Sequence, residues 1–147
     1  MEIIQSVVPT QEEIVEAQKN LAKLPQIEIK TEHYFLSGVY TRKIYLPQTA
    51  LVVGKKHRKD HLFLCIKGHI KVLHGDDVLE MREGDILEAK GELKKVVYAF
   101  VDSIVVNVHR TENTDLDIIE EELLYPEPDS PYDSGNKLKE SYLKEIA

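Results

Sequence analysis

Apolar residues follow a helical spacing near the beginning of the chain. Four of them recur every three or four positions: Ile14, Ala17, Leu21 and Leu24. This spacing is typical of one face of an α-helix. Thr10 and Glu13 form a capping-box pattern, in which each side chain accepts a hydrogen bond from a backbone N–H that the helix leaves free. Pro25 cannot continue a helix, so the pattern predicts one amphipathic helix between Thr10 and Pro25.

From residue 26 onward apolar positions alternate with polar ones, which is typical of β-strands. The alternating segments are short and are separated by residues that favour turns, above all glycine. The predicted strands cover residues 27–29, 34–40, 43–46, 50–53, 62–66, 69–73, 78–81, 85–88, 94–100 and 103–109. No long helical pattern lies between them, and parallel strands would need such a crossover. The pattern therefore favours an antiparallel sandwich or barrel.

A helical spacing returns after residue 110. Thr114 and Asp117 predict the start of a second helix. Its apolar side consists of Leu116, Ile119, Leu123 and Leu124. Residues 125–135 hold three prolines, as in an extended linker. A last helix, predicted over 137–146, would be marginal alone, so we expect it to pack on the barrel or on a neighbouring subunit.

These elements predict one domain in three parts: an N-terminal helical segment (1–25), a β-barrel (26–110) and a C-terminal part with helices and a Pro-rich linker (111–147). A chain of 147 residues is short for two separate cores.

The net charge of −7 argues against nucleic-acid binding, which needs clustered Lys and Arg. No signal peptide or membrane span is apparent, so we expect a soluble protein. Cys65 lies in an apolar run, which predicts a buried thiol in a reducing compartment.

Three histidines are candidate metal ligands. His57 and His61 flank the start of a predicted strand, and if residues 57–61 are extended, both side chains lie on one face. His109 ends the last predicted strand, on the same face as Asn107. Imidazoles at a barrel mouth could hold Zn, Fe, Mn or Ni. In the alternative reading, His57 is an exposed loop residue and His61 bonds to a neighbouring strand.

The run Gly54-x-x-His57-x-x-x-His61, followed by Gly68, resembles the first cupin motif, G-x5-H-x-H-x3–4-E-x6-G. His57 matches the second histidine of the motif, and His61 occupies the place of its glutamate. Lys55 stands where the first histidine belongs. The resemblance implies a cupin-type antiparallel β-barrel, that is, a double-stranded β-helix or jelly roll.

The chain resembles the second cupin motif only at the beginning of that motif, at residues 84–85. Lysines stand at positions 94–95, where the histidine of the motif belongs. Two of the four usual ligand positions therefore carry lysine. The chain also resembles small cupin-like proteins of tailed bacteriophages in the order of its segments 37–42, 46–47, 54–57, 61–62, 94–98, 108–109 and 114–120. This second resemblance implies a viral protein located in the host cytoplasm or in the virion.

Two kinds of basic residue are candidates for binding an anionic ligand. Arg42 either forms a buried ion pair or binds a substrate carboxylate through both of its guanidinium arms. Lys94 and Lys95 point in opposite directions along a strand, so one of them faces the barrel interior. A buried lysine needs a carboxylate partner or a lowered pKa.

Two functions are open at this point. The first is a binding or structural module, which forms a homo-oligomer or joins a phage assembly. The second is a metal-dependent enzyme for a small molecule, of isomerase, lyase or dioxygenase-like type. In that enzyme His57, His61 and His109 hold the ion, and Lys95 or Arg42 orients an anionic group.

Overall fold

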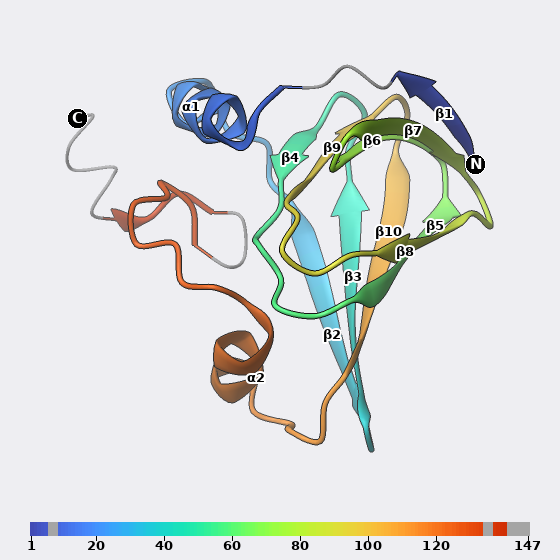
Figure 1. The fold of residues 1–147 in the computed structure, drawn as a ribbon, viewed down its shortest axis with the longest axis vertical. Coiled ribbons are helices and arrows are strands. Elements are labelled where there is room, and N and C mark those ends of the chain that lie inside the picture. Colours follow the sequence, from blue (N-terminus) through green and yellow to red (C-terminus); the bar gives the residue numbers. More distant parts are fainter. Residues whose placement is uncertain (6–8, 134–136, 141–147) are drawn as a thin grey trace.

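The computed structural model describes residues 1–5, 9–133 and 137–140, which form two antiparallel five-stranded sheets that face each other (Figure 1). The first sheet has the strand order β1 (Glu2–Gln5), β7 (Asp77–Arg82), β6 (His69–His74), β9 (Lys95–Ala99) and β4 (Leu51–Val53). The second has the order β2 (Lys30–Leu36), β3 (Val39–Leu46), β10 (Ser103–Arg110), β5 (His61–Lys67) and β8 (Ile86–Ala89). The predicted antiparallel barrel is confirmed.

The apolar core lies between the two sheets. Its members come from strands of both and include Ile44, Phe63, Ile70, Val72, Met81 and Val105. Cys65 belongs to this core and is fully buried, as its apolar neighbours in the sequence predicted. The inward side chains follow the two-residue alternation, because successive residues of a strand point to opposite faces of its sheet.

Most predicted strands are present, with three differences. The segment 34–40 is divided between β2 and β3, which meet at a turn where Gly38 has a φ of 78°. The predicted strand at 27–29 is wrong, because regular pairing begins only at Lys30. β1 was not predicted, since four residues are too few for a periodic signal.

The first helix, α1 (Gln11–Leu21), begins with the predicted capping box. Glu13 N donates to Thr10 Oγ1 (3.1 Å), and Thr10 N donates to Glu13 Oε1 (3.2 Å). Its buried side differs from the predicted one and consists of Ile14, Gln18 and Ala22. Ala17 is exposed, and Leu24 lies beyond the end of the helix. The apolar stripe is therefore narrower than the sequence suggested.

The second helix, α2 (Leu116–Leu123), has Asp115 as its N-cap and not Thr114. The Asp115 carboxylate accepts a hydrogen bond from Asp117 N (2.9 Å). The buried side of the helix packs against β3 through Ile119 and Leu123. No described helix is long and apolar enough to cross a membrane.

The last predicted helix, over 137–146, does not begin where expected. Residues 137–139 are not helical, and Leu138 instead forms an isolated antiparallel bridge with Tyr132. Residues 141–146 lie outside the described part of the chain.

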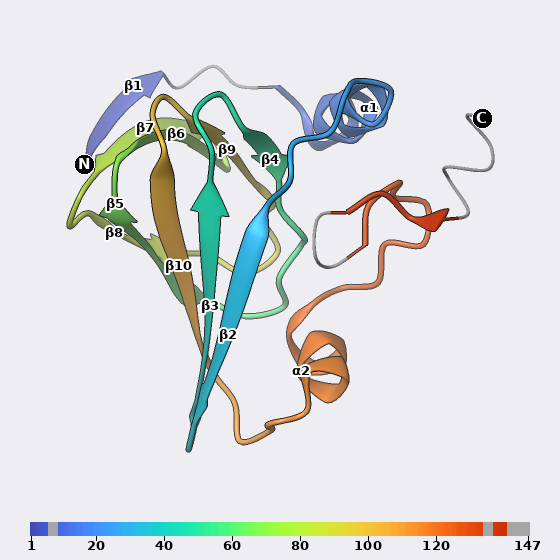
Figure 2. The same ribbon diagram turned by 180° about the vertical axis from the view of Figure 1, so that it is seen from behind.

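The C-terminal part is attached to the loop between β4 and β5, residues 54–60. Arg58 N donates to the carbonyl oxygen of Leu123 (2.8 Å). The neighbouring residues His57 and Leu124 form an isolated antiparallel bridge. Figure 2 shows α2 beside β2 and the following segment running along the barrel toward α1. These contacts place C-terminal residues at one end of the barrel.

We expect Gly68→Ala to lower the free energy of unfolding by roughly 3 kcal/mol or more. Gly68 has a φ of 95°, and a Cβ there would lie 2.2 Å from Ser103 Oγ and 2.7 Å from Asp102 O. Gly84 is the matched control, because its φ is 92° but no described atom lies within 4 Å of its would-be Cβ. Gly84→Ala should cost only the left-handed strain of about 1–2 kcal/mol. Urea unfolding of both variants measures the difference, and equal losses would contradict the clash.

Candidate metal centre

His57, His61 and His109 meet at the end of the barrel where α2 is attached. β5 and β10 are neighbouring strands, and the pairing of Leu62 with Val108 sets His61 and His109 next to each other. Both side chains point inward, with exposed fractions of 7% and 5%. The face that the sequence predicted for His109 is therefore the interior face.

His57 reaches the cluster by a different route from the one expected. The segment 57–61 is not extended, because the chain bends at residues 58–59 and β5 begins only at His61. His57 is held instead by its bridge to Leu124. A contact between residues far apart in the sequence therefore brings the third imidazole to the other two.

The geometry of the three rings is compact. Their candidate ligand atoms all lie within 4.8 Å of one another, and the ring centroids are 4.2–4.9 Å apart. A Zn–N bond is about 2.0–2.1 Å long, so the distances between the nitrogens must shorten by about 1 Å for the three rings to share one ion. A cavity of about 70 Å³ adjoins His57 and His109. One water needs about 10–15 Å³ of such space, so an ion and a few ligand atoms fit.

Burial lowers the pKa of all three imidazoles. Desolvation is the largest cause at each, and the pKa falls to about 4 for His61 and about 3 for His109. The pKa of His57 is lowered further, again by desolvation first and then by the other basic groups. The three rings are therefore neutral at pH 7 and carry the lone pairs that metal ions bind. His57 Nδ1 is buried and has no hydrogen-bond partner among the described residues, as suits a ligand atom.

Lys95 enters the same site from β9. Its side chain is 6% exposed, and its Nζ lies 2.7 Å from His61 Nε2 and 2.9 Å from Asn107 Oδ1. Nζ also lies 4.3 Å from the centre of the Phe63 ring. No described carboxylate forms an ion pair with it. Desolvation, followed by the Arg42 charge, lowers the pKa of Lys95 to about 7.

No family model and no curated protein sequence matches the chain. Solved structures do match it. A cupin superfamily protein from Desulfitobacterium hafniense has a TM-score of 0.52 and 12% identity, covering 75% of this chain and 98% of its own. KdgF from a Halomonas species has a TM-score of 0.53 and 15% identity, and the match covers 63% of this chain and 88% of KdgF. The chain has a cupin fold.

A third structure with this fold is a salicylate 1,2-dioxygenase from Pseudaminobacter salicylatoxidans. Its TM-score is 0.53 at 9% identity, and the match covers 76% of this chain and 35% of the dioxygenase. Identities this low establish the barrel and leave function to the site itself. The cupin barrel that the first motif implied is confirmed.

Lys55 and Lys94, the two further lysines at cupin motif positions, have polar partners outside the cluster of three imidazoles. Lys94 is buried and forms an ion pair with Glu127, and its Nζ also donates to Gln18 Oε1 (3.4 Å). Lys55 Nζ donates to the carbonyl oxygen of Tyr132 (2.7 Å) and lies 4.0 Å from Glu127 Oε2. Both lysines therefore connect the cupin barrel to its C-terminal part. Of the two features expected for a buried lysine, Lys94 has the carboxylate partner and Lys95 has the lowered pKa.

Arg42 lies on β3, paired with Asn107 of β10, and lines the same cavity as Lys95. Burial lowers the pKa of Arg42, whereas the negative charges of Glu120 and Asp133 oppose this shift. A guanidinium stays charged at neutral pH regardless. The structure thus brings both predicted ligand-binding residues to the cavity, and it adds an acidic group, Glu120, from α2.

Three polar residues of the cavity were not predicted as site residues. Asn107 could have been found, because it shares the inward face with His109. Tyr40 packs its ring against His109 (6.2 Å between centroids), and its hydroxyl lies 2.7 Å from His33 Nδ1. Burial raises the pKa of Tyr40 to about 12, so the phenol is neutral. Glu120 had no local signal, since only the packing of α2 brings it here.

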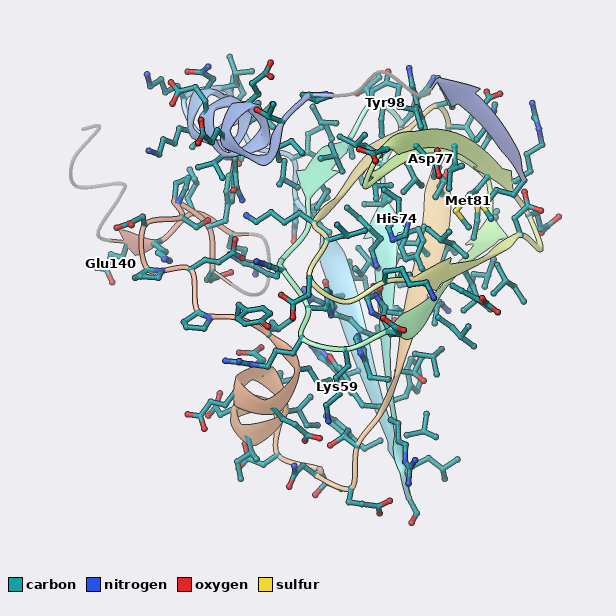
Figure 3. The ribbon with its side chains drawn as sticks, viewed as in Figure 1. Lys59, His74, Asp77, Met81, Tyr98 and Glu140 are labelled. Atoms are coloured by element: carbon teal, nitrogen blue, oxygen red, sulfur yellow. The ribbon has the colours of Figure 1, made fainter. Side chains whose placement is uncertain are left out.

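The exposed loop residue Lys59, labelled in Figure 3, contacts both α2 and His61. Its Nζ lies 3.8 Å from Glu122 Oε1 of α2, and its carbonyl oxygen lies 3.2 Å from His61 Nδ1. His74, also labelled in Figure 3, lies outside the cluster, where its Nε2 accepts a hydrogen bond from Lys90 N (3.0 Å). The histidines that converge are therefore those named from the cupin motif and the last strand.

The metal-free protein should lose stability as the pH falls below 6.5. In the unfolded chain His109 takes up a proton near its ordinary pKa of 6.5, but in the folded chain only near 3, so the unfolded state binds more protons between these values. The free energy of unfolding should therefore fall by about 1 kcal/mol per pH unit for this residue alone. Urea unfolding in a chelator at pH 6.5 to 5 should show a shallower slope for His109→Gln. An unchanged slope would contradict a buried neutral imidazole.

Proposed function

We propose that the barrel binds one divalent transition-metal ion through His57, His61 and His109 and uses it to bind and transform a small anionic molecule. The observation that carries the proposal is the convergence of three neutral imidazoles, two buried and one half-buried, whose candidate ligand atoms lie within 4.8 Å of one another. Imidazole is a good ligand for Zn, Fe and Ni, and it also serves in Mn sites. Three such ligands leave coordination positions open for water or substrate.

The remaining cavity residues favour a negatively charged ligand. Arg42, Lys55 and Lys95 bring three basic residues to the cavity lining, against one carboxylate among the described lining residues, Glu120. A bound ion would supply Lewis-acid chemistry to the oxygens of such a ligand. Arg42 would hold a carboxylate in a fixed orientation. The cavity of about 70 Å³ limits the ligand to a small molecule.

The walls on the barrel side are apolar. They include Ile44, Leu46, Val52, Phe63, Val97 and Val105. Apolar walls exclude water and strengthen the electrostatic contacts of a bound anion. A metal-dependent isomerase, lyase or dioxygenase-like reaction on a small carboxylate fits this combination of ligands, charge and size.

Calorimetric titration with Zn²⁺ should show about one ion bound per chain of tag-free protein. His57→Ala and His109→Ala should each weaken binding by at least about tenfold, because each removes one of three ligands. His69→Ala is the matched control, since this histidine lies outside the cavity, with Nε2 3.0 Å from Glu80 Oε1, and should bind like the wild type. If the two cavity variants retain wild-type affinity, the assignment of the ligands is wrong.

A second candidate function is self-assembly, and an exposed edge strand favours it. β2 is an edge strand of its sheet. Near the end of this strand Tyr34, Phe35 and Leu36 are exposed, and the exposed fraction of Leu36 is 74%. An edge strand carries free backbone donors and acceptors, and apolar edges are prone to pairing with another chain. We infer a second copy of this chain as the occupant of this edge.

Light scattering after size-exclusion chromatography tests this second candidate. The wild type should have the mass of a defined oligomer, and Phe35→Lys with Leu36→Lys should reduce it to a monomer, because both changes place charge in the contact. Ile86→Lys is the matched control. It is 52% exposed on β8, the opposite edge of the same sheet, and should leave the oligomer intact. A monomeric wild type would rule out self-assembly.

A further inference from the structure

Only one nitrogen of His61 has a lone pair available. His61 Nδ1 lies 3.2 Å from the carbonyl oxygen of Lys59, which can only accept a hydrogen bond. Nδ1 therefore carries the proton in the neutral ring, and Nε2 carries the lone pair. Lys95 Nζ lies 2.7 Å from Nε2 and can donate a hydrogen bond to it.

A metal ion ligated by His61 needs this same lone pair. An amino group that donates a hydrogen bond to Nε2 and a metal ion bonded to Nε2 exclude each other. In its protonated form Lys95 would also repel the ion strongly at this depth, because Lys95 is 6% exposed and charges interact more strongly away from water. The position of Lys95 is well defined by its second contact, the hydrogen bond to Asn107 Oδ1 (2.9 Å).

We propose that Lys95 acts as an internal competitor of the metal ion, because its amino group occupies the coordinating lone pair of His61. Metal binding then requires Lys95 to leave Nε2, and Lys95 sets the affinity of the site. The displaced amino group keeps Asn107 within reach and becomes available to an anionic ligand in the cavity. This inference rests on the proposed three-histidine site and adds its regulation.

The test is calorimetric titration of Zn²⁺ into the wild type and into Lys95→Met, which keeps the length of the side chain and removes its charge and its hydrogen bonds. The variant should bind Zn²⁺ at least about tenfold more tightly, as expected when a charge-assisted hydrogen bond no longer has to be broken. Lys71→Met is the matched control. It removes one lysine from β6, the strand next to β9, at a position outside the cavity, and should bind like the wild type.

Lys95→Gln, neutral but polar, provides a second test in case the methionine variant does not fold, with circular dichroism as the check on folding. Equal affinity of wild type and variants, or weaker binding by the variants, would overturn the competition while leaving the three-histidine site in place. Binding by the variants alone would support the competition and overturn metal binding by the natural protein. No binding by any of them would overturn both proposals.

Discussion

Burial of basic side chains at one end of the barrel is the physical constraint that shapes this site. Removing a charged group from water costs several kcal/mol unless a partner compensates. The three imidazoles meet this constraint by staying neutral. Lys94 meets it through its ion pair with Glu127. Lys95 meets it through hydrogen bonds to His61 and Asn107 and through a lowered pKa.

The C-terminal part completes the site. The bridge between His57 and Leu124 holds the third imidazole in place, and Glu120 of α2 lines the cavity. Glu127 lies between two lysines of the barrel and ties the following segment to it. The sequence-based division at residue 111 therefore separates two parts of the chain that together form one cavity.

The proposed metal site depends on one atom, His61 Nε2, which lies 2.7 Å from Lys95 Nζ. With Lys95 on that nitrogen, the cluster is a closed polar network inside a cupin barrel, and such a barrel can serve as a scaffold. With Lys95 displaced, three imidazoles and an adjacent cavity are available for metal chemistry on an anion. The exposed edge at β2 lies on the surface, and its Phe35 packs against the ring of Tyr40, which also lines the cavity.

The sequence alone determined most of the strands and that Asn107 and His109 share one face, because side-chain direction alternates along a strand whatever surrounds it. It also determined the start of α1, since the capping box of Thr10 and Glu13 is a local arrangement. Tertiary structure decided the position of His57, the pairing of Lys94 with Glu127 and the entry of Glu120 into the cavity. Each of these depends on a contact between residues more than thirty positions apart, such as 57 with 124 and 94 with 127, and no local pattern encodes such contacts.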